Sequence, residues 1–128
     1  MNRTILIIED DDIIRENLRE LLEMENYAVL EAENGKVGLD QLRDLTLSRQ
    51  TLPFVILLDL NMPVMSGREF LIAQRADPGA LAKIPVIITT AAQDTFDLGT
   101  EGFLRKPIDL HQLYEKLFQL TGVHSALE

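Results

Sequence analysis

The chain has 128 residues, a length that suits one domain with a single hydrophobic core. Its 21 acidic residues outnumber its 12 basic ones, whereas a protein that binds nucleic-acid backbones usually carries a basic stripe. It has no cysteine, which excludes disulfides and thiolate metal sites, and no apolar run long enough to span a membrane. We therefore expect an acidic domain that binds no nucleic acid directly and does not insert into a membrane. A reducing, cytoplasmic location fits the absence of cysteine.

Five short apolar runs alternate with stretches of helical periodicity. We predict strands over residues 4–8, 28–32, 54–58, 85–90 and 103–105. The third run is apolar throughout, as expected for a central strand that is covered on both faces. Alternating strands and helices are typical of βαβ units with a parallel sheet. The sequence thus predicts an α/β fold, a single (βα)5 domain spanning residues 1–128 with its core at about 4–121.

Capping residues mark the starts of the expected helices. The first helix follows the first strand, with Arg15 and Arg19 on its solvent side. Asn34 opens the second helix. Ser66, followed three residues later by a glutamate, has the spacing of a capping box, and Asp109 is the expected N-cap of the last helix. The buried face of the first helix should contain five apolar residues: Ile14, Leu18, Leu21, Leu22 and Met24.

Polar residues follow four of the predicted strands at the point where each strand ends: Glu9 and Asp10, Asp59, Thr90, and Lys106. The carboxyl ends of parallel strands meet at one crevice, so these groups should converge there. Carboxylates, a hydroxyl and an ammonium together suit a divalent cation and a phosphoryl group. Taken singly they also have structural explanations, because acid pairs form solvated turns, threonine favours strands and Lys-Pro favours turns.

Two features favour the functional interpretation. The acid pair continues into Asp11 and Asp12, and a bound cation would relieve the repulsion among four like charges, although at least one of these two should cap the first helix. Asp59 ends the apolar third strand, where a carboxylate is costly to bury unless it is paired or bound to metal. Pro63 and Gly67 then shape the loop that follows it.

From about residue 4 to residue 121 the chain resembles the receiver domain of response regulators in two-component signalling. The resemblance rests on four motifs in order: Glu9-Asp10, Asp59-x-x-x-Pro63 with Gly67, Thr90-Ala91, and Lys106-Pro107. It implies a flavodoxin-like sandwich with the strand order 2-1-3-4-5. It also implies a phosphoprotein. Because the last helix should end near Thr121, we expect the single-domain type, with no DNA-binding or catalytic domain following that helix.

The resemblance assigns Asp59 as the phosphoacceptor, which takes its phosphoryl group from a phosphohistidine of a sensor histidine kinase or a histidine phosphotransfer protein. The implied cofactor is Mg2+, bound directly by Asp10 and Asp59, through water by Glu9, and by the main-chain carbonyl of Asn61. Lys106 would contact one phosphoryl oxygen. The downstream partner is another protein, whose identity the sequence does not indicate.

The switch residues implied by the resemblance are Thr90, which would hydrogen-bond a phosphoryl oxygen, and Phe103, which would turn inward in response. The Lys106–Pro107 bond is expected to be cis. The family's usual aspartate and tyrosine are replaced here by Glu9 and Phe103. The segment between Thr90 and Lys106 is too short for the fuller fourth helix of the family, so we expect a shortened or irregular helix there. Residues 92–102 are then either the least stable part of the fold, as suits a switch, or a trimmed, rigid loop.

The leading hypothesis is a phosphorylatable receiver that is not an enzyme beyond assisting its own phosphorylation and dephosphorylation. One alternative is a pseudo-receiver, an interaction module that does not use phosphorylation; the short crossover favours it and the full set of site residues opposes it. A phosphatase of the haloacid-dehalogenase type would need an acid where Asn61 stands. A nucleotide-binding Rossmann module would need a glycine-rich loop after the first strand.

Overall fold

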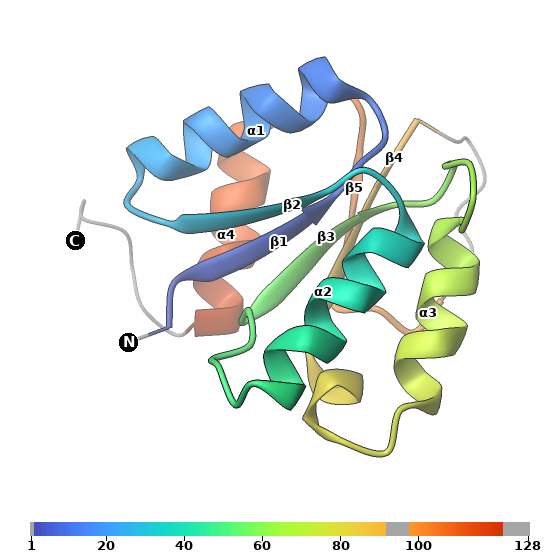
Figure 1. Cartoon of the computed structure of the whole chain (residues 1–128). Helices are drawn as coiled ribbons and strands as arrows, with labels where there is room; N and C mark the ends of the chain where they lie inside the picture. Colours follow the sequence, from blue (N-terminus) through green and yellow to red (C-terminus); the bar gives the residue numbers. More distant parts are fainter. Residues whose placement is uncertain (1, 92–97, 122–128) are drawn as a thin grey trace.

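The computed structural model describes residues 2–91 and 98–121. Within them, five strands alternate with four α-helices and a short 3-10 helix (Figure 1). None of the described helices has the length and hydropathy that a membrane crossing requires. The elements in chain order are β1 (Thr4–Ile8), α1 (Asp12–Met24), β2 (Ala28–Ala32), α2 (Gly35–Leu47), β3 (Val55–Asp59), α3 (Gly67–Ala76), η1 (Ala80–Lys83), β4 (Val86–Thr90), β5 (Gly102–Arg105) and α4 (Leu110–Thr121).

The strands form one parallel sheet with the order β2-β1-β3-β4-β5. This confirms the predicted flavodoxin-like topology, and the predicted strands match the observed ones to within one residue at each end. From β1 the chain goes to β2 on one side, and then to β3 on the other. The order therefore reverses between β1 and β3, where ligands of such sheets bind at the carboxyl ends.

Helices cover both faces of the sheet, with α1 and α4 on one face and α2 and α3 on the other (Figure 1). Successive strand residues point to opposite faces, so Ile5 and Ile7 join the core beneath α1 and α4, while Leu6 and Ile8 join the core beneath α2 and α3. Every residue of β3 is buried, as expected for a central strand. The sheet is thus a rigid support for the loops at its carboxyl edge.

The predicted helix starts are confirmed. Asp11 accepts hydrogen bonds from two main-chain N–H groups of the first turn of α1. The side chain of Asn34 accepts from one N–H group of α2, that of Val37, and Asp109 accepts from two N–H groups at the start of α4. Ser66 and Glu69 form a complete capping box at α3. These contacts involve residues only a few positions apart, which is why they could be predicted.

The buried face of α1 and the segment after β4 are the two places where the expectations for the helices are not confirmed. Met24 was expected in the buried face of α1 and is 78% exposed, so that prediction was wrong. It stands two residues after Leu22, which is buried, and two residues turn a helix by about 200°, to the opposite side. The shortened fourth helix was expected over a segment that includes residues 92–97, which lie outside the described residues; the flanking residues 91 and 98–101 are not helical.

A buried glutamine joins three elements at the amino-terminal end of the sheet. Gln74 of α3 is 2% exposed, and its side-chain amide donates to the carbonyl of Leu81 in η1 at 3.1 Å. It also donates to the carbonyl of Ile84, just before β4, at 3.0 Å. An apolar residue of the same size would leave these buried carbonyls without that donor.

We therefore expect Gln74→Met to lower the free energy of unfolding by about 2 kcal/mol, within the range for an unsatisfied buried polar group. Gln119→Met is the matched control, because Gln119 is an exposed residue of α4, and it should change stability by less than about 0.5 kcal/mol. Urea unfolding followed by circular dichroism measures both. Equal effects at the two positions would contradict this role for Gln74.

Candidate functional site

The carboxyl edge of the sheet brings the predicted acids together. One carboxylate oxygen from each of Glu9, Asp10 and Asp59 lies within 4.8 Å of the other two. Glu9 and Asp10 directly follow β1, and Asp59 is the last residue of β3. Because β1 and β3 are paired neighbours, their carboxyl ends deliver these groups to one place. Oxygen ligands of this kind suit a hard divalent cation.

Lys106 provides the positive charge of the site. Its Nζ forms an ion pair with Oε1 of Glu9 and lies 3.4 Å from Oδ2 of Asp59. The main-chain N–H of Lys106 donates to the carbonyl of Thr90 at 2.9 Å, which continues the pairing of β4 with β5 to the edge of the site. The Lys106–Pro107 bond is cis, as expected. The lysine is therefore held between two carboxylates rather than extended into solvent.

The site residues differ in their access to solvent. Glu9 is 1% exposed and Asp59 is 4% exposed, whereas Asp10 is exposed. Thr90 is fully buried at the end of β4. A ligand arriving from solvent would thus meet Asp10 first, while Asp59 presents its carboxylate from a fixed position.

Burial and neighbouring charges shift two pKa values. Burial raises the pKa of Glu9 from 4.5 to about 7; Lys106 and the N–H of Asp11 oppose this shift, and the charge of Asp59 adds to it. For Lys106, burial lowers the pKa, but the contacts with Glu9 and Asp59 outweigh burial, so the pKa is raised. The ammonium is therefore charged at neutral pH, and Glu9 changes its charge near neutral pH when no metal is bound.

The loop after β3 is held close to the phosphoacceptor candidate. Gly67 packs so tightly against Asp59 that a Cβ would collide with the main-chain carbonyl, and its N–H donates to the carbonyl of Leu60 at 3.0 Å. Asn61 donates its N–H to Oδ1 of Asp59 at 3.3 Å. In the loop between Asn61 and Gly67, Val64 has a φ of 69°, which is strained for a β-branched residue. Glycine at position 67 is thus required by close approach.

The four acids of the run have different environments. Asp11 caps α1, which confirms the expectation that one of the second pair would do so. Asp12 forms an ion pair with Arg15 at 2.6 Å. Glu9 contacts Lys106, and Asp10 remains at the solvent side of the acid group. Only the first two acids join Asp59, so the run is not a uniform patch of negative charge.

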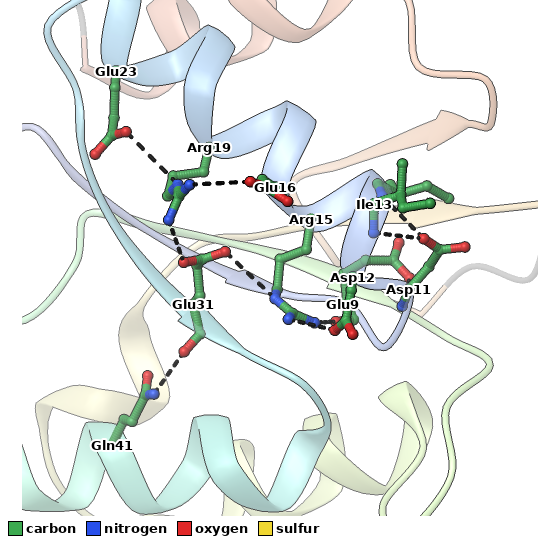
Figure 2. A network of polar contacts seen from close by, with 11 residues as sticks. Glu9, Asp11, Asp12, Ile13, Arg15, Glu16, Arg19, Glu23, Glu31 and Gln41 are labelled. Carbon is green, nitrogen blue, oxygen red and sulfur yellow. Dashed lines mark hydrogen bonds and ion pairs between the residues drawn. The ribbon is translucent and has the colours of Figure 1, made fainter.

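Arg15 is the residue that sequence reasoning missed. We expected it on the solvent side of the first helix, but its side chain is only 16% exposed. Its Nη1 donates to the main-chain carbonyl of Glu9 at 2.7 Å (Figure 2). An arginine six residues after a strand-end acid is the only sequence signal, and it says nothing of the direction of the side chain.

The predicted switch aromatic, Phe103, is half-buried against the core beneath α2 and α3. The guanidinium of Arg105 lies 5.8 Å from the centre of its ring. The roles of Phe103 and Thr90 in a switch, like those of the other site residues, stay predictions.

Comparison with known proteins agrees with this geometry. The model of the response regulator receiver domain matches residues 5–118. The chain is 30% identical to the polar-differentiation response regulator DivK of Brucella anthropi, over 95% of this chain and 98% of that protein. It is 34% identical to the transcriptional regulatory protein CrdR of Helicobacter pylori, over 91% of this chain but only 54% of that protein. The chain thus spans about half the length of some of its relatives.

A solved structure resembles the fold and carries a ligand of the expected kind. The response regulator TrrA of Thermotoga maritima, in complex with Mg2+ and BeF, superposes with a TM-score of 0.77 and 27% identity. The match covers 94% of this chain and 99% of that one.

The raised pKa of Glu9 predicts that the contribution of this residue to the stability of the metal-free protein is lost as the pH rises. The carboxyl binds its proton more tightly in the folded chain, with a pKa of about 7, than at its ordinary value of 4.5. Its contribution to stability is therefore complete below about pH 4.5 and is lost as the pH rises through about 7. Relative to Glu9→Gln, the free energy of unfolding of the wild type should fall by on the order of 3 kcal/mol across this window.

Urea unfolding in EDTA at a series of pH values measures this difference. Parallel stability curves for the wild type and Glu9→Gln would show that Glu9 keeps an ordinary pKa in the folded chain.

Proposed function

This chain belongs to the response regulator receiver domain family, and we propose that it accepts a phosphoryl group on Asp59 with the aid of Mg2+. The donor would be a phosphohistidine of a sensor histidine kinase or a histidine phosphotransfer protein. The observation that carries the proposal is the group of three carboxylates within 4.8 Å, with Lys106 beside Asp59. Signal output would be a change in protein–protein contacts in the cytoplasm, and the chain would act on no substrate other than its own phosphoryl group.

In the proposed reaction a carboxylate oxygen of Asp59 attacks the phosphorus, an O–P bond forms, and the P–N bond to the donor imidazole breaks. Asp59 suits this role because the sheet, the Gly67 contact and the Asn61 N–H hold its carboxylate in place. Lys106, 3.4 Å from that carboxylate, would move to a phosphoryl oxygen. The hydroxyl of Thr90 would donate to another. Bound Mg2+ would neutralise charge on the transferring group.

The donor set fits a magnesium ion. Mg2+ usually takes one or two carboxylates directly and keeps several waters, so three carboxylate oxygens within 4.8 Å of one another could hold it by direct and water-mediated contacts. Asp10 and Asp59 would be the direct ligands, and Glu9 would contact the ion through water. The ion pair of Glu9 with Lys106 supports this order, because that carboxylate already has a compensating charge. The main-chain carbonyl of Asn61 would be the remaining Mg2+ ligand from the protein.

We expect Asp59 to be the only residue that acetyl phosphate modifies in the presence of Mg2+. Asp59→Asn should abolish the mass increase of one phosphoryl group, because an amide oxygen is a poor nucleophile. Asp44→Asn, at an exposed position of α2, is the matched control and should react as the wild type does. Intact-mass spectrometry reads the result. A phosphoryl adduct that persists in Asp59→Asn would contradict the assignment.

Asp10 should matter more than Glu9 for magnesium affinity. At about pH 8, where Glu9 is ionised, Asp10→Asn should weaken Mg2+ binding at least tenfold and Glu9→Gln about threefold, because a direct ligand contributes more than one acting through water. Isothermal titration calorimetry measures both. A larger loss in Glu9→Gln would mean that Glu9, rather than Asp10, ligates the ion directly.

A further inference from the structure

A single arginine contacts three parts of the fold around the acid group. Arg15 donates from Nη1 to the main-chain carbonyl of Glu9 at 2.7 Å and from Nη2 to Oδ1 of Asp12 at 2.6 Å. Its Nε lies 3.5 Å from Oε1 of Glu31 on β2. Figure 2 shows the guanidinium between the acid run and this strand. All three contacts use one planar group, whose direction is therefore set.

Glu31, the β2 residue that Arg15 contacts, is itself held by neighbouring residues. Glu31 pairs with Ile7 of β1 in the sheet, and its main-chain carbonyl accepts from the side chain of Gln41 in α2 at 2.7 Å. Its Oε2 also accepts from Nη1 of Arg19 at 3.2 Å (Figure 2). The main chain of Glu31 is thus held by the sheet and by α2, and its carboxylate is held by Arg19 of α1 as well as by Arg15.

The carbonyl that Arg15 binds belongs to the peptide between Glu9 and Asp10, two of the three acids of the site. The N–H of Glu9 donates to the carbonyl of Ala32 at 3.0 Å, which continues the pairing with β2 by one residue. The paired register of β1 with both neighbours ends at Ile8, one residue before this carbonyl. The orientation of the peptide between Glu9 and Asp10 depends on ψ of Glu9 and φ of Asp10, the two backbone angles that set how these side chains lie relative to each other. Arg15 binds this peptide from the side of α1.

We propose that Arg15 is a positioning residue for the cation site. Its guanidinium fixes the peptide that joins Glu9 to Asp10, and it pairs with Asp12, which is not among the three acids that converge. This inference rests on the proposed binding of Mg2+. It means that residues of α1 and β2 contribute to the affinity of the site for Mg2+. Groups that orient metal ligands from behind change metal affinity about 10- to 100-fold when they are replaced.

Lysine at position 15 would keep the positive charge but not the planar fork, so it could not bind the carbonyl and the two carboxylates together. The chain contains a matched control on the same helix. Arg19 also binds Glu31, and its other ion pairs in the described structure are with Glu16 and Glu23, away from the acid site. Arg15→Lys and Arg19→Lys therefore make the same chemical change, but only the first removes a contact to the site.

The test is calorimetric titration of the whole chain with Mg2+ at about pH 8, combined with metal-free thermal unfolding. We expect Arg15→Lys to weaken Mg2+ binding about tenfold and Arg19→Lys to change it less than twofold. In reactions with acetyl phosphate, the Mg2+ concentration for half-maximal rate should rise by the same factor in Arg15→Lys. The rate at saturating Mg2+ should return to within about twofold of the wild type, because the bound site is then complete.

A second pair of variants avoids any change in the arginine. Glu31→Gln removes the negative charge that pairs with Arg15 and should weaken Mg2+ binding about threefold, as expected for a more distant orienting group. Glu23→Gln removes the same charge from a side chain whose only ion pair among the described residues is with Arg19, and should have no measurable effect.

Three results would overturn the inference. Unchanged Mg2+ affinity in Arg15→Lys, even with a lower melting temperature, would leave Arg15 a purely structural role. Equal losses in Arg15→Lys and Arg19→Lys would show that the loss does not depend on the contact to the Glu9 carbonyl, because only Arg15 makes that contact and both arginines contact Glu31. Failure of the wild type to bind Mg2+ would remove the proposed metal site and this inference together, which distinguishes it from the first two results.

Discussion

The site depends on one electrostatic constraint, which is that two nearly buried carboxylates share one ammonium. Glu9 and Asp59 come from adjacent strands, and Lys106 lies between them. Without a counter-charge, two carboxylates so close together in a buried place would repel and at least one would take up a proton. Lys106 reduces this repulsion, yet the pKa of Glu9 is still raised to about 7 by burial and by Asp59. The site therefore retains a deficit of positive charge that a cation can satisfy.

The sheet makes this arrangement possible because it is buried on both faces and parallel throughout. All four core residues of β1 from Ile5 to Ile8 are at most 1% exposed, so the strand cannot shift to relieve the charges at its end. The tight approach of Gly67 to Asp59 and the strained Val64 hold the third strand's loop in the same way. Rigid elements thus support charges that would otherwise move apart.

Around this centre, polar contacts extend the support to the edge of the sheet. Arg15 connects the acid run to Glu31 on β2, and Gln41 connects that strand to α2 (Figure 2). Asp11 and Asp12, which belong to the same acid run, serve the helix cap and the arginine. The four adjacent acids therefore divide into two that form the site and two that hold the helix beside it.

The sequence by itself determined the strands, the helix caps and the set of residues at the carboxyl edge. These follow from local rules, such as apolar runs, Asp11 or Ser66 facing N–H groups a few residues away, and the convergence of parallel strand ends. Only the tertiary structure decided that Met24 faces solvent, that Gln74 is buried, and that Lys106 pairs with Glu9 as well as Asp59. It also turned Arg15 from an expected surface residue into a contact of the site. These outcomes depend on partners 6 to 97 positions away or on the packing of whole elements, which periodicity along the chain does not encode.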